Sequence, residues 1–389
     1  MKTFLYPATA LALTLSCTGA NAAELRIGVL TTLSGAQAAP GVEMRDGIEL
    51  AVKQLGGKVG GQPTALVVAD DQFNPGIAKQ VAERLVRKDK VQVLTGIIYS
   101  NVLLTAAPVV LEAGRIVLSS NAGPSAYAGE KCDPGFFNVS WQNDSVHEAA
   151  GKYATDKGYK RITTIAPNYP AGRDAIAGFK RMYKGDVVDE AYPKLGQLDF
   201  AVEIARQKDQ KPDAVFFFLP GGMGANFIKQ LRAANLDPSI LLTTMTTSDQ
   251  DLFAATGESM LGLVNAGSWS TDTDNAANKA FVAAFEQAYK RLPSFYAAHG
   301  YDAIMLLDAA VRENGGNVDD PASLRHALAN AKFHSVRGDF MLGPNQFPLQ
   351  DYHIRTVSRD ASGRLYNRTG SRISSKHGDV YASACKMRK

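Results

Sequence analysis

Polar, small and aromatic residues directly follow several short apolar runs, and their types suit non-covalent binding of an anion. Ser100 offers a hydroxyl at the start of a predicted helix, where free N–H groups and partial positive charge favour carboxylates. After the next run, Asn121, Ala122 and Gly123 are small enough to let a ligand approach the backbone. The further candidates are Tyr169, Gly221, Gly222 and Met245 in later turns, and Tyr296 at the start of a later helix.

Each candidate also has an ordinary structural interpretation. Ser100 could cap its helix, and Tyr169 could belong to a plain loop. The turn at Gly221 and Gly222 lacks the spacing of a phosphate-binding loop, and Tyr296 could be a core residue. We nevertheless expect one shared site, because ligands in open α/β sheets bind beyond the carboxyl ends of the strands.

The sequence does not offer the groups that catalysis or metal binding would need. It has no GxSxG elbow, no P-loop and no HExxH or CxxC pattern, and its six histidines are scattered. The net charge of +4 is not concentrated in a basic run, which disfavours nucleic acid as a partner. We therefore expect a binding protein that needs no cofactor and is not an enzyme.

Strand-like runs alternate with amphipathic helical patterns along most of the chain. Residues 25–30, 66–69, 91–96 and 116–119 read as strands, and the alternation restarts with strands at 161–166, 214–219 and 240–243. Strands separated by helices form parallel sheets that are covered on both faces. The fold class that we predict is α/β, with two doubly wound parallel-sheet lobes.

The helix-rich region after residue 272 needs a sheet to cover, so we expect the chain to return to the first lobe. The N-terminal lobe then comprises residues 23–142 and 272–350, and the C-terminal lobe comprises residues 143–271 and 351–389. No low-complexity linker separates the two, which favours interwoven lobes.

Residues 1–22 are predicted to be a cleaved export signal. Lys2 supplies a positive start, an apolar stretch follows, and Ala20-Asn21-Ala22 matches an A-x-A cleavage site near Ala22. The alternatives are a buried first element, or a lipid anchor on Cys17, whose preceding residues fit a lipobox poorly. Export would place the mature protein in the periplasm.

The cysteines agree with an oxidising compartment. Removal of Cys17 would leave Cys132 and Cys385, which are natural disulfide partners there. We expect a Cys132–Cys385 bond that ties the C-terminal tail to a loop, although two unpaired thiols are the alternative.

Four stretches together resemble the leucine/isoleucine/valine-binding-protein family of type I periplasmic binding proteins. Residues 25–35 match its opening, 41–57 its first helix, 70–78 its DD…P..A pattern and 119–122 its second loop. The resemblance implies two lobes joined by a three-crossing hinge, a ligand cleft between them, and delivery of a small molecule to an ABC-transporter permease. Hinge closure would trap the ligand, and we expect a monomer.

The resemblance also assigns roles to residues. The family's carboxylate-binding serine corresponds to Ser100, and its second-loop contacts correspond to Asn121, Ala122 and Gly123. Its ammonium-binding acid would lie near Met245, where this sequence has none; the nearest is Asp249. A buried ammonium without an anionic partner is costly.

The chain is therefore similar to the branch that binds aromatic acids such as benzoates and hydroxycinnamates. Met245, Tyr169 and Tyr296 would line the slot for the ring. The alternatives are a receptor for a branched-chain amino acid or an amide- or urea-like solute, and a ligand-sensing domain for a signalling partner.

Overall fold

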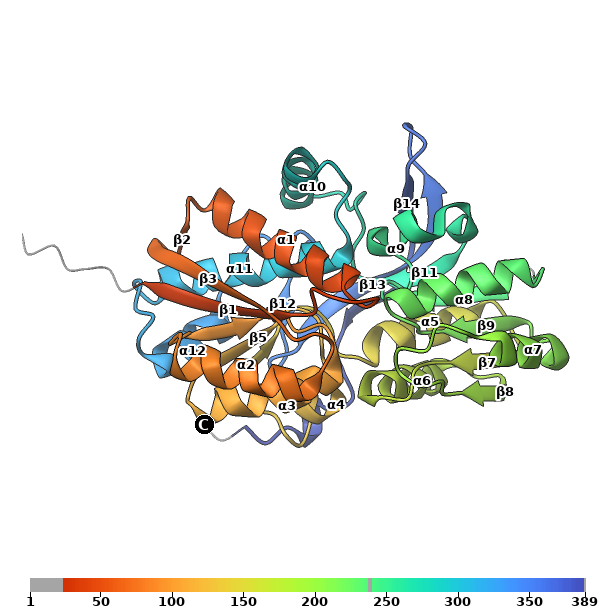
Figure 1. Ribbon diagram of the computed structural model, residues 1–389, viewed down its shortest axis with the longest axis horizontal. Helices are drawn as coiled ribbons and strands as arrows, with labels where there is room; N and C mark the ends of the chain where they lie inside the picture. Colours follow the sequence, from red (N-terminus) through yellow and green to blue (C-terminus); the bar gives the residue numbers. More distant parts are fainter. Residues whose placement is uncertain (1–23, 237–239, 388–389) are drawn as a thin grey trace, which may run out of the picture.

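The computed structural model describes residues 24–236 and 240–387 and contains two α/β lobes (Figure 1). The first sheet has the strand order β2-β3-β1-β4-β5-β6, in which all neighbours are parallel except β2 and β3. Its strands are β1 (Leu25–Thr31), β2 (Lys58–Val59), β3 (Gln62–Asp70), β4 (Val93–Thr95), β5 (Ile116–Ser119) and β6 (Phe136–Asn138).

Helices cover both faces of this sheet, as a doubly wound lobe requires. Figure 1 shows α1 on one side and α2 and α3 on the other. A Cβ added at Gly47 of α1 would lie 2.0 Å from the Ala297 carbonyl oxygen, so glycine is what allows α1 and α11 to pack this closely. The helices of this lobe are α1 (Ala39–Gln54), α2 (Pro75–Arg87), α3 (Ser100–Glu112), α4 (Ser125–Ala128), α11 (Phe295–Glu313) and α12 (Pro321–Asn330).

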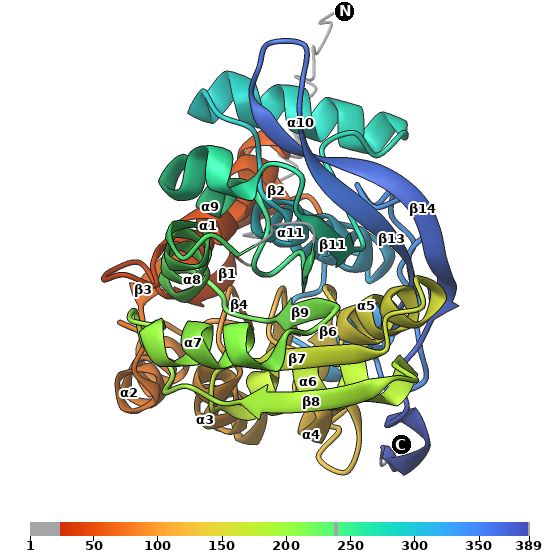
Figure 2. The ribbon, with the colours of Figure 1, turned by 90° about the vertical axis from the view of Figure 1, so that its right-hand side faces the viewer.

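The second sheet has the order β12-β13-β11-β10-β9-β7-β8, with β14 paired to β13. Its centre is parallel, whereas β13 runs antiparallel to β11 and β14 antiparallel to β13, forming the long hairpin of Figure 2. The strands are β7 (Arg161–Ile165), β8 (Asp186–Ala191), β9 (Ala214–Phe217), β10 (Leu241–Thr244), β11 (Val264–Gly267), β12 (Met341–Leu342), β13 (Pro348–Arg359) and β14 (Leu365–His377).

The helices that follow these strands explain why β9 is so apolar. Phe216 and Phe217 are fully buried on opposite faces of the sheet: Phe216 stacks on Phe179 of α6, and Phe217 packs against Phe227 of α8. The remaining helices are α5 (Ser145–Asp156), α6 (Pro170–Met182), α7 (Ala201–Gln210), α8 (Gly222–Ala233), α9 (Gln250–Thr256), α10 (Ala276–Tyr289) and the 3-10 helices η2 (Gly257–Met260) and η3 (Ala382–Ala384).

Within the described residues the chain passes between the two lobes three times before its tail returns to the first lobe. The first passage runs from β6 to α5, the second from β11 to α10, and the third from α12 to β12 and β13. The doubly wound architecture is thus present, and α11 packs against α1 of the first lobe while α12 packs against α11. The residue boundaries that we gave to the two lobes, 23–142 with 272–350 and 143–271 with 351–389, stay a prediction.

A disulfide between Cys132 and Cys385 confirms the predicted pair. It fastens the end of the chain to the loop after α4, so the tail beyond β14 lies against the first lobe. The predicted signal peptide, its cleavage near Ala22 and the alternative anchor Cys17 lie outside the described residues. In the part of the chain that the structure describes, no helix is both long and apolar enough to cross a bilayer.

Reduction of this disulfide should weaken the fold. The bond closes a loop across 253 residues of sequence, and such a cross-link restricts the unfolded chain, so its loss should cost about 2–4 kcal/mol. Urea unfolding of the wild type with and without reductant measures the difference. The double variant Cys132→Ser/Cys385→Ser is the control, because reductant should not change its midpoint. An unchanged wild-type midpoint in reductant would contradict the prediction.

Candidate functional site

A small enclosed cavity lies where the two lobes meet. It encloses about 10 Å³, about the room of one water molecule. The first lobe and the first crossing segment contribute eight wall residues, and the loops at the carboxyl ends of β7, β9 and β10 contribute the other five. The wall consists of Ile98, Tyr99, Ser100, Asn121, Ala122, Trp141, Asn143 and Tyr296 on one side and Tyr169, Ala171, Phe218, Pro220 and Thr246 on the other.

Two helix N-termini from opposite lobes reach this cavity. Ser100 is the first residue of α3, and Ala171 is the second residue of α6. Neither helix has a side-chain cap, and the amides of residues 100–102 and of 171–172 donate no hydrogen bond among the described residues. Unpaired N–H groups with the positive end of a helix dipole favour an anion.

Ser100 does not cap α3, so the ordinary interpretation of this serine fails. Its side chain is buried, and its Oγ accepts a hydrogen bond from Asn143 Nδ2 at 3.1 Å. Because the oxygen already accepts, the hydroxyl hydrogen is free to donate toward the cavity.

The loop after β5 supplies the next part of the wall. Asn121 Nδ2 donates to the Ile98 carbonyl at 2.7 Å, and Asn121 Oδ1 accepts from Trp141 Nε1 at 3.3 Å. These bonds fix both the amide and the indole ring. Ala122 follows with its side chain buried at the wall, where the small residue leaves room for a ligand.

Aromatic rings form another part of the wall. Tyr169 and Phe218 stack with an interplanar angle of 12°, and Tyr296 adds a third ring from α11. Burial raises the pKa of Tyr169 and Tyr296 well above the usual value for tyrosine, so both phenol groups stay protonated donors. The cavity is thus a slot between rings with hydrogen-bond donors at its edges.

Four predicted residues lie outside this wall. The Gly123 N–H is taken by Asn143 Oδ1 at 3.0 Å, and a Cβ there would lie 2.0 Å from the Trp141 carbonyl oxygen, so this glycine serves packing. Met245 is fully buried behind the wall, beside Ser268, while its neighbour Thr246 lines the cavity. Gly221 and Gly222 lie at one of the contacts between the lobes.

At this contact Gly222 faces backbone and Gly221 faces the Gln37 side chain. A Cβ on Gly222 would lie 2.7 Å from the Ala36 carbonyl oxygen of the first lobe, and one on Gly221 would lie 2.4 Å from Gln37 Oε1. Gly221 also has a φ of +59°, which favours glycine. Both residues are therefore tied to the closed arrangement of the lobes.

Asp249, the acid nearest to the expected ammonium position, is already engaged. It caps α9, accepts the Phe295 N–H at 3.2 Å and pairs with the buried Arg355 at 3.2 Å. It does not line the cavity, whose wall contains no charged side chain among the described residues.

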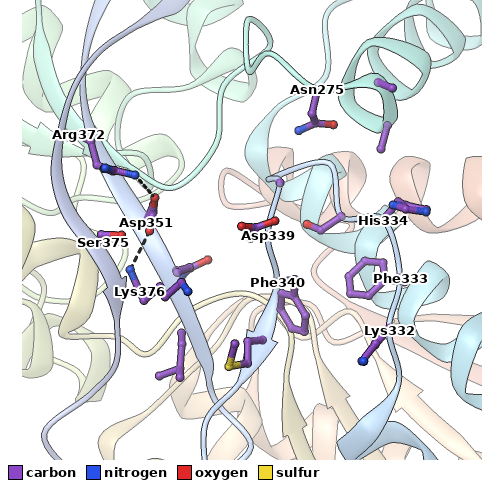
Figure 3. A pocket seen from close by; sticks show the side chains of 17 residues that line it. Asn275, Lys332, Phe333, His334, Asp339, Phe340, Asp351, Arg372, Ser375 and Lys376 are labelled. Atoms are coloured by element: carbon purple, nitrogen blue, oxygen red, sulfur yellow. Dashed lines mark hydrogen bonds and ion pairs between the residues drawn. The ribbon is translucent and has the colours of Figure 1, made fainter.

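A larger hollow of about 900 Å³ lies beside β13 and β14, away from the predicted residues (Figure 3). Its wall carries opposite charges that pair with one another, as between Arg372 and Asp351 at 3.1 Å. Figure 3 shows this pair facing Phe333, His334 and Lys332 across the hollow. No residue that the sequence indicated contributes to it, and we assign the ligand site to the smaller cavity between the lobes.

Comparison with known proteins identifies the family. A family model described as "Periplasmic binding protein" matches residues 24–363. The chain belongs to the periplasmic binding protein family. This periplasmic binding protein is 27% identical over 377 residues to Leu/Ile/Val-binding protein homolog 6 of Brucella abortus (strain 2308), with 92% of this chain and 94% of that protein covered.

Solved structures of binding proteins share its architecture. A solute-binding protein of an ABC transporter from R. palustris, in complex with benzoate, is 33% identical with a TM-score of 0.88, covering 94% of this chain and 100% of that one. Another, from Rhodopseudomonas palustris BisB5 in complex with 3,4-dihydroxybenzoic acid, is 32% identical with a TM-score of 0.86, covering 92% and 99%. A leucine-binding protein from Thermotoga maritima, 21% identical with a TM-score of 0.80 over 90% of this chain and 98% of that one, has the same fold.

These findings confirm the predicted family, fold class and non-enzymatic role. The protein is a periplasmic solute-binding protein of an ABC transporter; members of the family bind small molecules and work with membrane permeases. The expectations of a monomer and of no nucleic-acid partner stay predictions.

The sequence interpretation missed several wall residues. Phe218, Pro220 and Thr246 follow or end strands that were recognised, so the rule on strand ends could have found them. Trp141 and Asn143 follow β6, a strand of only three residues that the hydrophobic pattern did not reveal. Tyr99 and Ile98 precede the recognised Ser100, and Ala171 follows the recognised Tyr169.

Gly222→Ala should hinder closure of the lobes without weakening either one. Alanine suits the first turn of a helix, but its Cβ would meet the Ala36 carbonyl of the opposite lobe. We expect a larger radius of gyration by small-angle scattering and an unchanged unfolding free energy. Gly76→Ala, in the first turn of α2, is the matched control because its Cβ would meet only Asn74 Oδ1, at 3.2 Å. A wild-type scattering profile for Gly222→Ala would contradict this role.

His147 should make the protein less stable in acid. It is buried against Trp141 and Phe218, neither ring nitrogen has a partner, and burial lowers its pKa from 6.5 to about 3. The unfolded chain binds the proton more tightly, so the free energy of unfolding falls as the pH drops from about 6.5 toward 3, by at most about 5 kcal/mol.

His147→Phe should flatten this dependence in urea unfolding between pH 4 and 7. The control is His326→Phe, an exposed site on α12. Parallel stability curves for the wild type and His147→Phe would show that the imidazole does not contribute.

Proposed function

We propose that the protein captures a small aromatic carboxylate of the benzoate or hydroxycinnamate type by hinge closure and presents it to a membrane permease. The observation that carries the proposal is an aromatic cavity that receives two uncapped helix N-termini and whose wall, among the residues that the structure describes, has no charged side chain. The neighbours with bound benzoate and 3,4-dihydroxybenzoic acid support the same ligand class.

The wall suits an anion better than a cation. Ser100 and the free amides of α3 and α6 are donors, and a carboxylate accepts from such groups. An ammonium would instead need an acceptor with negative charge, and Asp249 is already paired with Arg355.

The rings suit a flat apolar group. Tyr169, Phe218 and Tyr296 come from three different elements, so a planar ligand would contact aromatic surface from both lobes. Asn121, Ala122 and Thr246 add small or polar contacts at the margin. Small-molecule sites commonly combine an apolar slot with a few polar groups in this way.

Ligand entry requires the lobes to separate. A cavity with room for about one water molecule cannot admit an aromatic acid as it stands. The close approach of Gly221 and Gly222 to residues 36 and 37 shows that the lobes are in contact beside the cavity. Rotation about the three crossings would open it, and the ligand would then be enclosed as the lobes return.

A branched-chain amino acid is the second candidate. The named relatives from Brucella favour it, and so does Asp251, whose Oδ2 is buried without a hydrogen-bond partner. Asp251 lies near enough to raise the pKa of Tyr99 and Tyr296 in the wall, and burial raises the pKa of Asp251 itself. A ligand ammonium could pair with this carboxyl group.

A ligand panel distinguishes the two candidates. Thermal-shift and calorimetric measurements with benzoate, 4-hydroxybenzoate, coumarate, leucine, isoleucine and valine should show stabilisation by the aromatic acids alone. Asp251→Asn should leave their affinity within about twofold, because they carry no ammonium. Binding of leucine that Asp251→Asn abolishes would establish the amino-acid function and overturn the proposal.

A further inference from the structure

We propose that Asn143 and Asp174 form a relay that orients the Ser100 hydroxyl toward the ligand's carboxylate when the lobes are closed. Asn143 lines the cavity, and Asp174 lies behind it on α6 of the second lobe. The inference rests on the proposed binding of a carboxylate, and it makes Asn143 and Asp174 positioning residues.

The hydrogen bonds of Asn143 fix the orientation of its amide. The Gly123 N–H can only donate, and it points to Asn143 Oδ1 at 3.0 Å. The NH2 group therefore faces the other way, toward Ser100 Oγ at 3.1 Å and Asp174 Oδ2 at 3.0 Å. Asn143 is buried, so these protein groups are its partners.

This orientation determines what Ser100 can do. Since its oxygen accepts from Asn143, the hydroxyl hydrogen is left to donate elsewhere. The cavity is on that side, next to the free amides of α3. An acceptor in place of the Asn143 amide would take the hydroxyl hydrogen and leave an anionic ligand with one donor fewer.

Asp174 connects this arrangement to lobe closure. Its carboxylate also accepts from Ser125 of the first lobe, from the N–H at 3.2 Å and from Oγ at 2.9 Å. Asp174 thus bridges α6, the start of α4 and the crossing segment that carries Asn143. Separation of α6 from α4 breaks the bonds to Ser125, and the carboxylate that holds the Asn143 amide then loses its fixed position.

A double-mutant cycle tests the link between Asn143 and Ser100. The ligands are benzoate and benzamide, which have the same ring but differ in charge, and the affinities are measured by calorimetry. Asn143→Ala should weaken benzoate binding about tenfold in the wild type and less than about twofold in Ser100→Ala. The ratio of benzoate to benzamide affinity should fall as well, which a loss of packing alone would not cause. Equal losses in both backgrounds, or for both ligands, would overturn the relay.

The proposed link between Asp174 and closure of the lobes is tested without ligand. Hydrogen exchange in residues 121–128 should be faster in Asp174→Asn, because the carboxylate that holds the Ser125 N–H is removed. Asp213→Asn is the matched control: Asp213 also accepts backbone N–H groups in the second lobe, from Lys160 and Arg161, but lies on another loop. Unchanged exchange at Ser125 in Asp174→Asn would refute the lobe link.

The two proposals fail in different ways. If the wild type binds leucine and no aromatic acid, the proposed function fails, and the cycle is run with leucine and leucinamide, which again differ in their carboxyl group. If it binds none of these compounds, the exchange measurement decides the relay alone. If benzoate binds but the cycle is additive, the proposed function stands and the relay fails.

Discussion

The structure depends on one electrostatic constraint: two helices from opposite lobes direct their positive ends at the same small cavity. Within residues 24–236 and 240–387, the first turns of α3 and α6 have free N–H groups and no acidic side chain caps either helix. Like poles that approach each other repel, and a buried donor without an acceptor is costly. An anion between the helices removes both penalties at once. Closure of the lobes and binding of an anion therefore favour each other.

A backbone contact limits the approach of the lobes. Gly222 lies so close to the Ala36 carbonyl that a single methyl group there would force the lobes apart, and Gly221 lies beside the Gln37 side chain. Within the first lobe, the Tyr99 hydroxyl donates to the Gln37 carbonyl at 3.1 Å and so supports the loop that meets the second lobe. Such a contact leaves little room for adjustment, so the fold determines the distance between the N-termini of α3 and α6 when the lobes are closed. Under the proposed function, this fixed separation would select ligands by thickness and favour a planar ring.

Sequence patterns predicted the lobes well because parallel strands and amphipathic helices have strong periodicities, as β9 and α2 illustrate. They also indicated Ser100, Asn121, Ala122, Tyr169 and Tyr296, which line the cavity, since the ends of parallel strands share one edge of a sheet.

The rule on strand ends cannot say which residue of a loop turns inward. It therefore does not distinguish Met245, which lies behind the wall, from Thr246, which lines the cavity. It could not reveal Asn143, whose role depends on Asp174 from a lobe that comes later in the sequence. Glycines are ambiguous in sequence for a related reason: small size permits close approach to a ligand and to backbone alike, and only the folded chain shows that Gly123 and Gly222 approach backbone.

The hydrogen-bond donors at the cavity are uncharged, and this affects how a transported solute is released. An ion pair between ligand and protein would have to be broken and resolvated on opening, and a buried partner left behind would be strongly unfavourable. Here the groups that would hold a carboxylate are backbone amides and Ser100, and water can replace the ligand at each of them once the lobes separate. The ion pair of Asp249 with Arg355 lies away from the cavity and need not be broken when the lobes open. Affinity then comes largely from closure itself, because dipoles act more strongly where water is excluded. A permease that pulled the lobes apart would weaken every contact with the solute together, without needing to compete for any one of them.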